Sequence, residues 1–358
     1  MTVTVTVTGG GPLSLARVLQ EQPGPILALA PMQDVTDLAF WRVMHAYGGP
    51  DVYFTEYFRV YPNSSLDRTI LSSIIENTTG RPVVAQLIGN DIPSLTRSAL
   101  ELQRHAIAAV DLNLGCPAPV VYRKCAGGGL LRELKLVDAI LGALRAAVSC
   151  PLTVKTRIGF EDTEPFEGLL DVLASHRLDL VTVHGRTVRE MYRSEVHYDF
   201  IARAVSRLPC PVLANGNVYS ARKGAEVLAT TGARGLMIGR GAIRNPWIFE
   251  QFRSLQRGEP ILQPTGREVF RYLEVLFEGM RSPILTERSH VQRIKKHLNY
   301  VGIGLEPTGA FLHRVRRATA EPELFAIFRD YLDHDEPLAL EPYALALNTC
   351  DVMAGEHL

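Results

Sequence analysis

Short apolar runs alternate with longer amphipathic stretches between Ile26 and Ile238. The longer stretches place apolar residues three and four positions apart, which is typical of helices that pack one face against a core. This alternation predicts parallel strands joined by right-handed crossovers, and eight repeats favour a (β/α)8 barrel, the TIM-barrel fold of the α/β class. The strand-like runs are residues 26–30, 51–55, 83–87, 110–114, 152–156, 178–183, 212–214 and 235–238.

An open, doubly wound sheet is the alternative fold for such a pattern. That fold would place a glycine-rich turn directly after the first strand. Here the first run is followed by Pro31, Met32 and Gln33, without a glycine. The closed barrel is therefore the prediction.

The alternation ends after Asn245–Pro246–Trp247, and only helical patterns follow. The segments 267–281, 286–301, 308–318 and 321–331 predict a small C-terminal helical bundle. The expected domains are an N-terminal tail (1–24), the barrel (25–251), the helical domain (252–345) and a C-terminal tail (346–358).

Composition narrows the classes of protein that this chain can represent. The 358 residues are 46% hydrophobic and carry 38 basic and 38 acidic side chains. The five cysteines form no CxxC pair, which argues against a disulfide framework and a structural zinc site and favours a reducing cytoplasm. The sequence contains no apolar run long enough to span a membrane, no metal-ligand spacing and no secretory signal pattern, so we expect a cytoplasmic protein without metal. A monomer is the default expectation.

Charge is unevenly distributed in the helical region. Basic residues dominate 288–317, including Arg293, Lys295 and Lys296, whereas acidic residues dominate 321–358. A charged run is usually a solvated face. A basic helical face attached to an enzyme barrel nevertheless favours a phosphate-rich partner.

Polar residues or glycines end six consecutive predicted strands. Barrel enzymes place their chemistry at these carboxyl ends, so the pattern predicts an active site there. The residues are Gln86, Asn113, Cys116, Lys155, Arg157, His184, Arg186, Asn215, Gly216, Asn217, Gly239, Arg240 and Gly241.

The chemistry of this end can be partly assigned from the residue types. Lys155 and Arg157 share one face of a strand, where they need an anion or an electron-rich ring. Gly216 and Gly239 follow the last two strands, where barrels commonly bind phosphate. These features predict a phosphorylated cofactor. Cys116 lies between a glycine and a proline at a strand end; a buried hydrophobic role is its alternative.

Several motifs, taken in order, resemble those of the tRNA-dihydrouridine synthases, flavin enzymes that reduce uridine in RNA. The matching segments are Leu29–Ala30–Pro31–Met32, Ala85–Gln86–Leu87, Asp111–Leu112–Asn113–Leu114–Gly115–Cys116–Pro117, Val154–Lys155–Thr156–Arg157, Val183–His184–Gly185–Arg186–Thr187, Ala214–Asn215–Gly216–Asn217, Ile238–Gly239–Arg240–Gly241 and Asn245–Pro246–Trp247. The helical tail also resembles the RNA-binding domain of that family, less specifically.

The resemblance implies FMN as cofactor, NADPH as reductant and tRNA as partner. Hydride would pass from reduced FMN to C6 of uracil while the Cys116 thiol protonates C5, a role that needs no activating base. The implied cofactor contacts are Pro31, Met32, Gln33, Gln86, Lys155, His184, Asn215, Gly216, Asn217, Gly239 and Arg240. The implied contacts to the flipped-out uracil and the RNA are Asn113, Arg157, Arg186, Tyr192, Arg293, Lys295 and Lys296.

Some points depart from the family pattern or stay open. Asn217 stands where relatives commonly carry an acid, and Cys125 is a second candidate for the acid. A flavin barrel that reduces a small pyrimidine, an RNA-binding protein without turnover, and an enzyme acting on another RNA are the alternatives. The role of the glycine cluster 127–129 is open between close approach to RNA and close approach to flavin.

Overall fold

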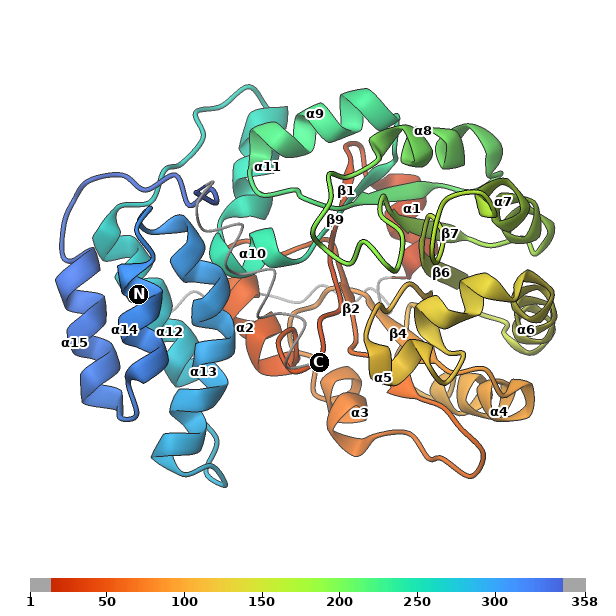
Figure 1. Cartoon of the computed structure of the whole chain (residues 1–358), viewed down its shortest axis with the longest axis horizontal. Coiled ribbons are helices and arrows are strands. Elements are labelled where there is room, and N and C mark those ends of the chain that lie inside the picture. The colour runs from red at the N-terminus through yellow and green to blue at the C-terminus, as the bar shows by residue number, and fades with distance from the viewer. Residues whose placement is uncertain (1–13, 344–358) are drawn as a thin grey trace.

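The structure is a computed structural model that describes residues 14–343. The predicted C-terminal tail lies outside the described residues, as does the start of the predicted N-terminal tail. Figure 1 shows two parts, a barrel surrounded by helices and a group of helices against one side of it.

Eight parallel strands close into a barrel, so the predicted (β/α)8 fold is confirmed. The pairing order runs from β2 through β1, β9, β8, β7, β6 and β5 to β4, and a direct pairing of β2 with β4 closes the ring. The strands are β1 (Ile26–Leu29), β2 (Val52–Phe54), β4 (Val83–Ile88), β5 (Ala109–Leu114), β6 (Leu152–Arg157), β7 (Leu180–His184), β8 (Val212–Asn215) and β9 (Gly235–Ile238). The short β3 (Phe58–Arg59) adds to the end of β4.

The helices that follow the strands cover the outside of the barrel (Figure 1). Their apolar faces and the outward strand residues form one continuous core cluster. The covering helices are α2 (Leu38–Ala46), α3 (Arg68–Ile75), α4 (Ile92–Leu102), α6 (Leu134–Ala147), α7 (Phe166–Ser175), α8 (Tyr198–Arg207), α9 (Ala221–Thr231) and α11 (Ile248–Gln256). Shorter helices in the loops are α5 (Pro119–Tyr122), η1 (Gly127–Arg132) and α10 (Arg240–Arg244).

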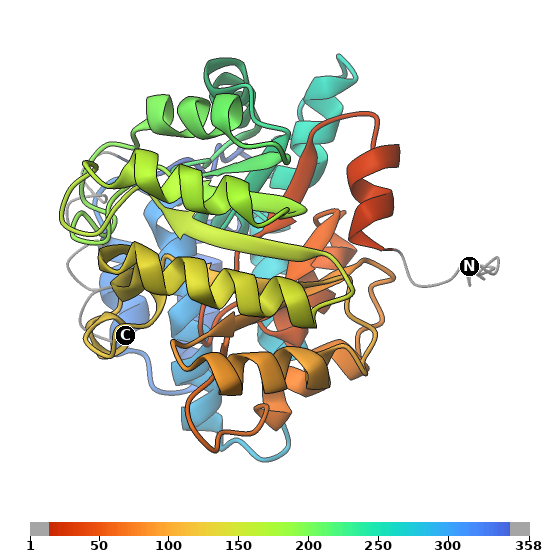
Figure 2. The same ribbon diagram turned by 90° about the vertical axis from the view of Figure 1, so that its right-hand side faces the viewer.

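Part of the predicted N-terminal tail is a helix instead. Helix α1 (Leu15–Glu21) begins at Ser14, whose side chain accepts a hydrogen bond from the Arg17 backbone N–H. Leu15 is buried against the residues that fill the barrel interior, such as Ile26 and Met237. Figure 2 shows α1 (red) at the end of the barrel where the strands begin. With seven residues, this helix is too short to show a clear apolar period in the sequence.

The C-terminal helices match the predicted bundle. They are α12 (Gly266–Gly279), α13 (Glu287–Val301), η2 (Gly302–Gly304), α14 (Ala310–Arg317) and α15 (Glu321–Leu332). A reciprocal capping box between Thr265 and Glu268 begins α12. The bundle shares the outer core of the barrel, since α12 packs on α2 and α13 packs on α10, and the Tyr272 hydroxyl donates to the Ile243 carbonyl at 2.8 Å.

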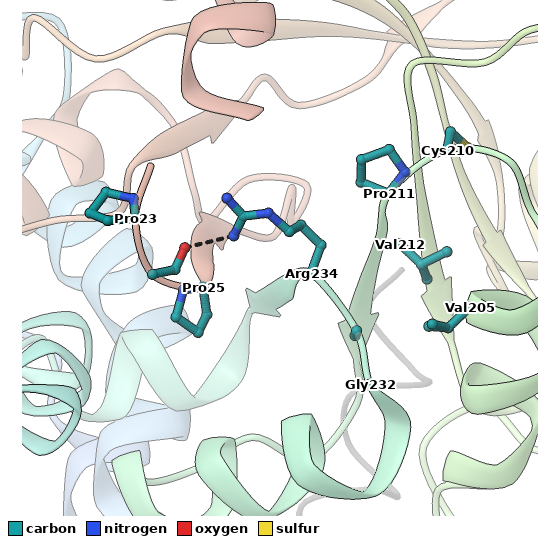
Figure 3. Close-up of a pocket in the computed structure, with 10 residues that line it drawn as sticks. Pro23, Pro25, Val205, Cys210, Pro211, Val212, Gly232 and Arg234 are labelled. Carbon is teal, nitrogen blue, oxygen red and sulfur yellow. Dashed lines mark hydrogen bonds between the residues drawn. The ribbon is translucent and has the colours of Figure 1, made fainter. Parts of the chain in front are cut away.

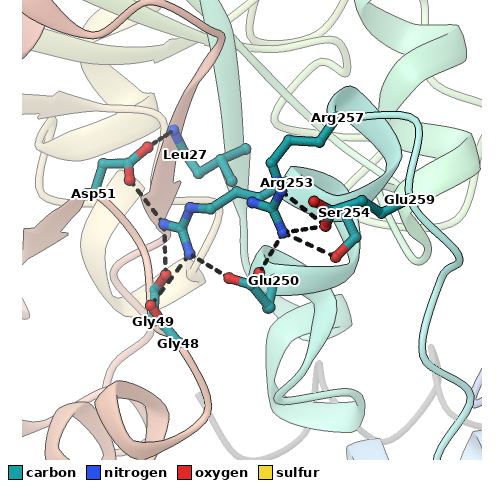
Figure 4. A network of polar contacts seen from close by, with 9 residues as sticks. All are labelled: Leu27, Gly48, Gly49, Asp51, Glu250, Arg253, Ser254, Arg257 and Glu259. Atoms are coloured by element: carbon teal, nitrogen blue, oxygen red, sulfur yellow. Dashed lines mark hydrogen bonds and ion pairs between the residues drawn. The ribbon is translucent and has the colours of Figure 1, made fainter.

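An arginine on α11 ties the helix ring to the beginning of the barrel (Figure 4). The Arg253 guanidinium donates to the carbonyls of Gly48 and Gly49 and pairs with the buried Asp51 carboxylate at 2.7 Å. The other oxygen of Asp51 accepts the Leu27 N–H of β1 at 2.9 Å. The network therefore joins β1, the loop before β2 and α11.

A pocket of about 510 Å³ lies where the strands begin (Figure 3). Prolines, valines and small residues line most of it. Its guanidinium group, that of Arg234, already donates to the carbonyls of Gln22 and Gly24. The catalytic end of a barrel is the opposite one, where the strands end.

Within residues 14–343, none of the helices combines the length and the apolar character that a membrane crossing needs. The same residues contain no cluster of three or more His, Cys, Asp or Glu side chains suited to a metal ion.

Candidate active site

The strand register brings the predicted polar residues together at one end of the barrel. Asn113 of β5 lies opposite Lys155 of β6, and Arg157 lies opposite His184 of β7. His184 in turn lies opposite Asn215 of β8. The carboxyl ends of four adjacent strands therefore present an uninterrupted polar rim.

A chain of buried hydrogen bonds holds the loop that carries Cys116. The Thr153 hydroxyl and the Gln86 amide both donate to the Asp111 carboxylate, at 2.5 and 2.7 Å. Gln86 accepts from the Asn113 amide at 2.8 Å. The Asn113 oxygen then accepts the backbone N–H groups of Gly115 and Cys116, both at 2.9 Å. Gln86 and Asn113 thus fix the loop, and each retains one amide N–H for a ligand.

The Asp111 carboxyl group, at the start of this chain of hydrogen bonds, is destabilised in its charged form by burial. Burial raises the pKa of Asp111 to about 6, although the bonds from Thr153 and Gln86 and the Lys155 charge oppose the shift. The folded state therefore binds this proton more tightly than the unfolded state does. The contribution of Asp111 to stability is fully present below its unfolded pKa and is lost as the pH rises through about 6.

We therefore expect the free energy of unfolding of Asp111→Asn, relative to that of wild type, to be higher at neutral pH than at acidic pH. The amide keeps one acceptor for Gln86 and can donate to the Thr153 hydroxyl, so the chain survives without the buried charge. This difference in unfolding free energy between variant and wild type should increase by about 2 kcal/mol from about pH 4 to about pH 7.5. Urea unfolding at both pH values would measure it. Asp199→Asn, at an exposed carboxyl of α8, is the control. A pH-independent effect of Asp111→Asn would contradict the assignment.

Cys116 lies in an apolar surrounding of Ile88, Ala118 and Val121. Burial raises the pKa of its thiol above the ordinary value and outweighs the Ala118 N–H and the charges of Arg157 and Lys155, which favour the thiolate. The group is therefore a neutral thiol at physiological pH. Such a thiol can donate a proton, whereas a nucleophilic cysteine must be a thiolate.

The glycine cluster packs against this thiol loop. A Cβ on Gly127 would lie 2.9 Å from the Cys116 Cβ, and one on Gly128 would lie 2.8 Å from the Cys116 carbonyl. The Gly128 N–H also donates to that carbonyl at 3.1 Å. The close approach of these glycines is thus to the protein itself. Cys125, at the end of the intervening turn, has a left-handed backbone with φ 53°.

Lys155 and His184 line one side of the mouth. Burial and the neighbouring Arg157 charge lower the pKa of Lys155 to about 8. Within residues 14–343 its ammonium has neither a hydrogen-bond partner nor an ion-pair partner. Burial and the charges of Arg157 and Lys155 hold the pKa of His184 well below its ordinary value, so the imidazole is neutral. This side of the mouth suits an electron-rich or anionic ring.

The ends of β8 and β9 form a backbone cradle at Gly216 and Gly239. Gly216 has φ +129°, and its carbonyl accepts the Tyr198 hydroxyl at 2.9 Å. The Asn215 amide donates to the Met237 carbonyl, and Arg240 donates to the Asn217 oxygen at 3.2 Å. A Cβ on Gly239 would crowd the Met32 sulfur at 3.2 Å, which brings the loop after β1 against the loop after β9.

These features are compatible with the phosphorylated flavin that the sequence suggests. The buried Gln33 oxygen, in the loop after β1, has no hydrogen-bond partner within the part of the chain that the structure describes. It is an acceptor available to a ring N–H. Gln33, Lys155 and the cradle at Gly216 and Gly239 therefore offer an acceptor, a cation and a close backbone approach. Pro31 and Met32 are half-buried beside Gln33.

Two predicted substrate contacts are buried and make hydrogen bonds within the protein. Arg157 is 2% exposed and donates to the carbonyls of Gly115, Thr187 and Met191, at 2.8 to 2.9 Å. Arg186 is 1% exposed and donates twice to the Ser194 carbonyl. Both guanidinium groups hold the loop after β7 in place. Tyr192 of that loop lies under Arg157 and Arg240, 5.3 and 4.8 Å from its ring centre, and is half-buried.

The basic face of α13 is turned partly toward the barrel. Arg293 pairs with Asp37, and Lys296 pairs with Asp34 at 3.2 Å. Lys295 is 7% exposed and donates to the Arg316 carbonyl at 3.0 Å, so its ammonium is directed into the protein. Lys296 and Arg293 border a surface hollow of about 420 Å³ together with Arg288, Ser289 and Gln292.

The structure adds residues that the sequence analysis did not select. His297 of α13 contacts the Val35 carbonyl at 2.9 Å. Glu56, after β2, accepts the Asp34 N–H, and burial together with the Asp37 charge raises its pKa to about 7. Both hold the loop after β1. Neither residue belongs to a recognisable sequence motif. Their contacts with the loop after β1 become visible only in the three-dimensional structure.

A closed parallel barrel with its polar groups gathered at the carboxyl mouth defines an enzyme of the TIM-barrel class. Its fold is similar to that of a solved structure of histamine dehydrogenase from Rhizobium sp. 4-9, with a TM-score of 0.51 and 10% identity over 71% of this chain and 48% of that one. The family model for dihydrouridine synthases matches residues 28–329. The chain belongs to the dihydrouridine synthase family and is an oxidoreductase.

Curated relatives match over most of their length. The chain is 30% identical to the tRNA-dihydrouridine(16) synthase of Neisseria meningitidis serogroup A, over 85% of this chain and 94% of the relative. It is 32% identical to the protein of the same name from Ralstonia nicotianae, over 86% of this chain and 96% of the relative. It is 35% identical to tRNA-dihydrouridine synthase B of Pseudomonas putida, over 73% and 78%. The predicted family is therefore confirmed.

Proposed function

We propose that this protein reduces the C5–C6 double bond of a specific uridine in tRNA, with FMN as cofactor and NADPH as reductant. The observation that carries the proposal is the neutral Cys116 thiol at the mouth of a dihydrouridine synthase barrel. The neighbouring Lys155 and His184 support a flavin site in the same mouth. The proposal includes a cytoplasmic monomer, with which the free thiols of Cys116, Cys125, Cys150 and Cys210 are compatible.

The proposed cofactor site uses the Lys155 and His184 side of the mouth and the cradle at Gly216 and Gly239. When bound, FMN supplies a hydride for C6 of uracil. Pro31, Met32 and Gln33 would line its ring from β1, while Gln86, Lys155 and His184 would face it from β4, β6 and β7. Lys155 would hold negative charge through its ammonium, since its pKa of about 8 leaves it mostly protonated at neutral pH. Asn215, Gly216, Asn217, Gly239 and Arg240 would hold the ribityl chain and phosphate.

Cys116 is the proposed proton donor to C5 of uracil. The hydrogen-bond chain from Asp111 to Asn113 fixes the backbone of its loop and thereby the direction of the thiol. The remaining N–H of Asn113 is available to a uracil carbonyl. Tyr192, held by Arg157 and Arg240, is placed to contact the flipped-out base. Arg157 and Arg186 serve the site by holding the loop that carries Tyr192.

The proposed RNA contact on the helical domain centres on the α13 hollow. Lys296 is half-exposed, and its pair with the exposed Asp34 is worth little in water. Its ammonium can therefore exchange Asp34 for an RNA phosphate. Arg288 borders the same hollow.

We expect Lys296→Met to weaken tRNA binding and to lower the slope of log affinity against log salt by about one. Lys295→Met is the matched control, one residue away. It should leave the salt slope unchanged, because the Lys295 ammonium is used by the Arg316 carbonyl. Filter binding of tRNA at several salt concentrations would measure both slopes. Equal losses of slope in the two variants would contradict this surface.

Mapping dihydrouridine in RNA tests the proposed function directly. RNA from cells that lack this gene should miss one dihydrouridine in tRNA, and the purified protein with NADPH should restore it. Restoration in ribosomal RNA alone would redirect the proposal to another RNA. A flavin protein that reduces free pyrimidines and leaves both RNAs unchanged would refute it.

A further inference from the structure

The three residues that follow β2 contact three different parts of the mouth. The Thr55 hydroxyl accepts the Gln86 N–H of β4 at 3.0 Å, in a fully buried position. The Glu56 carboxyl group accepts the Asp34 N–H in the loop after β1. Tyr57 is 8% exposed and packs in the small apolar cluster that borders the thiol. This segment therefore joins the loop after β1 to the side of the mouth that holds the proposed acid.

The loop after β1 is closed by bonds of its own, which leave the Asp34 N–H to Glu56. The Thr36 hydroxyl accepts the Met32 N–H at 2.8 Å, and the Met32 carbonyl accepts the N–H groups of Val35 and Thr36. Asp34 lies inside this turn and has a left-handed backbone with φ 58°. A residue other than glycine keeps this conformation when its surroundings fix it. Glu56 supplies such a contact from the barrel side.

We propose that Glu56 is a positioning residue for the cofactor, because its carboxyl group fixes Asp34 and thereby directs the neighbouring Gln33 into the mouth. The inference rests on the proposed function for the identity of the cofactor. Gln33 precedes Asp34 in the chain, and its buried side-chain oxygen has no hydrogen-bond partner among the residues that the structure describes. Glu56 acts on the cofactor only through this loop.

The hold of Glu56 on the loop does not require a charge. Burial and the charges of Asp37 and Asp34 raise the pKa of Glu56 to about 7. Arg293 and Lys296 of α13 pair with these two aspartates. Part of the Glu56 carboxyl groups are therefore neutral at physiological pH, and a neutral carboxyl group still offers its carbonyl oxygen to the Asp34 N–H. Glutamine offers the same oxygen.

The contact of α13 with Asp34 is the alternative support for the same residue. Lys296 contacts the Asp34 carboxylate at 3.2 Å, whereas Glu56 contacts the Asp34 backbone. The ion pair is at least half-exposed on both sides, which makes it weak in water. Asp34→Asn separates the two supports, since it removes the charge of the side chain, keeps the N–H and tolerates the left-handed backbone.

Amide hydrogen exchange in the purified full-length protein tests the hold of Glu56 directly. The exchange of a peptide that contains residues 31–37 would be followed by mass spectrometry. The release of FMN from the holoprotein after dilution would be followed by flavin fluorescence. Glu56→Ala should accelerate both processes about tenfold, because the Asp34 N–H loses its acceptor. Glu56→Gln should restore both rates to near those of wild type.

Two further variants serve as controls. Asp34→Asn should keep both rates near those of wild type. Glu76→Ala, at an exposed acid that follows α3, should do the same and controls for the loss of a carboxyl group. Should Glu56→Ala not fold, Glu56→Asp withdraws the carboxyl group by one methylene and should accelerate both processes in the same direction.

The outcomes that overturn the inference differ from those that refute the proposed function. Unchanged exchange of residues 31–37 in Glu56→Ala overturns the inference, and so does a failure of Glu56→Gln to restore it. Equal acceleration in Asp34→Asn assigns the hold to Lys296, and faster exchange without faster FMN release makes Glu56 a structural residue only; both results overturn the inference. A wild-type protein that holds FMN through Glu56 and forms dihydrouridine in no RNA refutes the proposed function alone.

Discussion

Dihydrouridine formation should fall by at least about 100-fold in Cys116→Ala, because a positioned general acid contributes about 10²–10⁴-fold. The thiol is neutral at physiological pH and its loop is held by the Asp111–Gln86–Asn113 chain, so no other group takes its place. Alanine keeps the Cβ that contacts Gly127 and leaves the loop packing intact. The rate would be measured on unmodified tRNA at saturating NADPH.

Cys125→Ala is the matched control for this experiment. Cys125 is half-buried at the end of the turn after α5, and its substitution should leave activity within a few-fold of wild type. If Cys116→Ala kept activity and Cys125→Ala lost it, the assignment of the acid would pass to Cys125.

Arg157→Met should destabilise the protein by about 4 kcal/mol, because two buried carbonyls and one part-buried carbonyl lose their donor and each unsatisfied buried group costs about 1–3 kcal/mol. These carbonyls belong to Gly115, Thr187 and Met191, so the loss frees the Cys116 loop from the loop after β7. The free energy of unfolding would be measured in urea.

Arg189→Met in the same loop provides the comparison. Arg189 is exposed and paired with the exposed Glu161, so its loss should leave the free energy of unfolding nearly unchanged. A normal stability of Arg157→Met, combined with lost binding of uridine-containing RNA, would return Arg157 to the role that the sequence alone suggested.

The barrel was predictable because its strands and helices have different periods of apolar residues. All eight predicted strands are present, and the four C-terminal helices lie within a few residues of their predicted bounds. The polar mouth was predictable for a related reason. In parallel strands the carboxyl ends meet at one edge, so Asn113, Lys155 and His184 had to come together.

The direction of a side chain was less predictable than its position along a strand. Arg157 and Arg186 have the chemistry of substrate contacts, yet both are buried and donate to loop carbonyls. Lys295 looks like Lys296 in the sequence, but the two occupy different faces of α13 and only Lys296 reaches solvent. Such outcomes depend on loop paths and helix docking, which apolar periodicity does not encode. What the glycines at 127–129 approach could not be predicted either, because it depends on the path of the Cys116 loop.

The docking of α13 on the loop after β1 limits how the protein can be re-engineered. Arg293, Lys296 and His297 contact Asp37, Asp34 and Val35, and this loop begins with Pro31, Met32 and Gln33. The helical bundle is therefore not an independent module that can be exchanged between family members to redirect the enzyme to another uridine. A functional chimera must transplant residues 31–37 together with the bundle, because the barrel loop contributes one side of this interface.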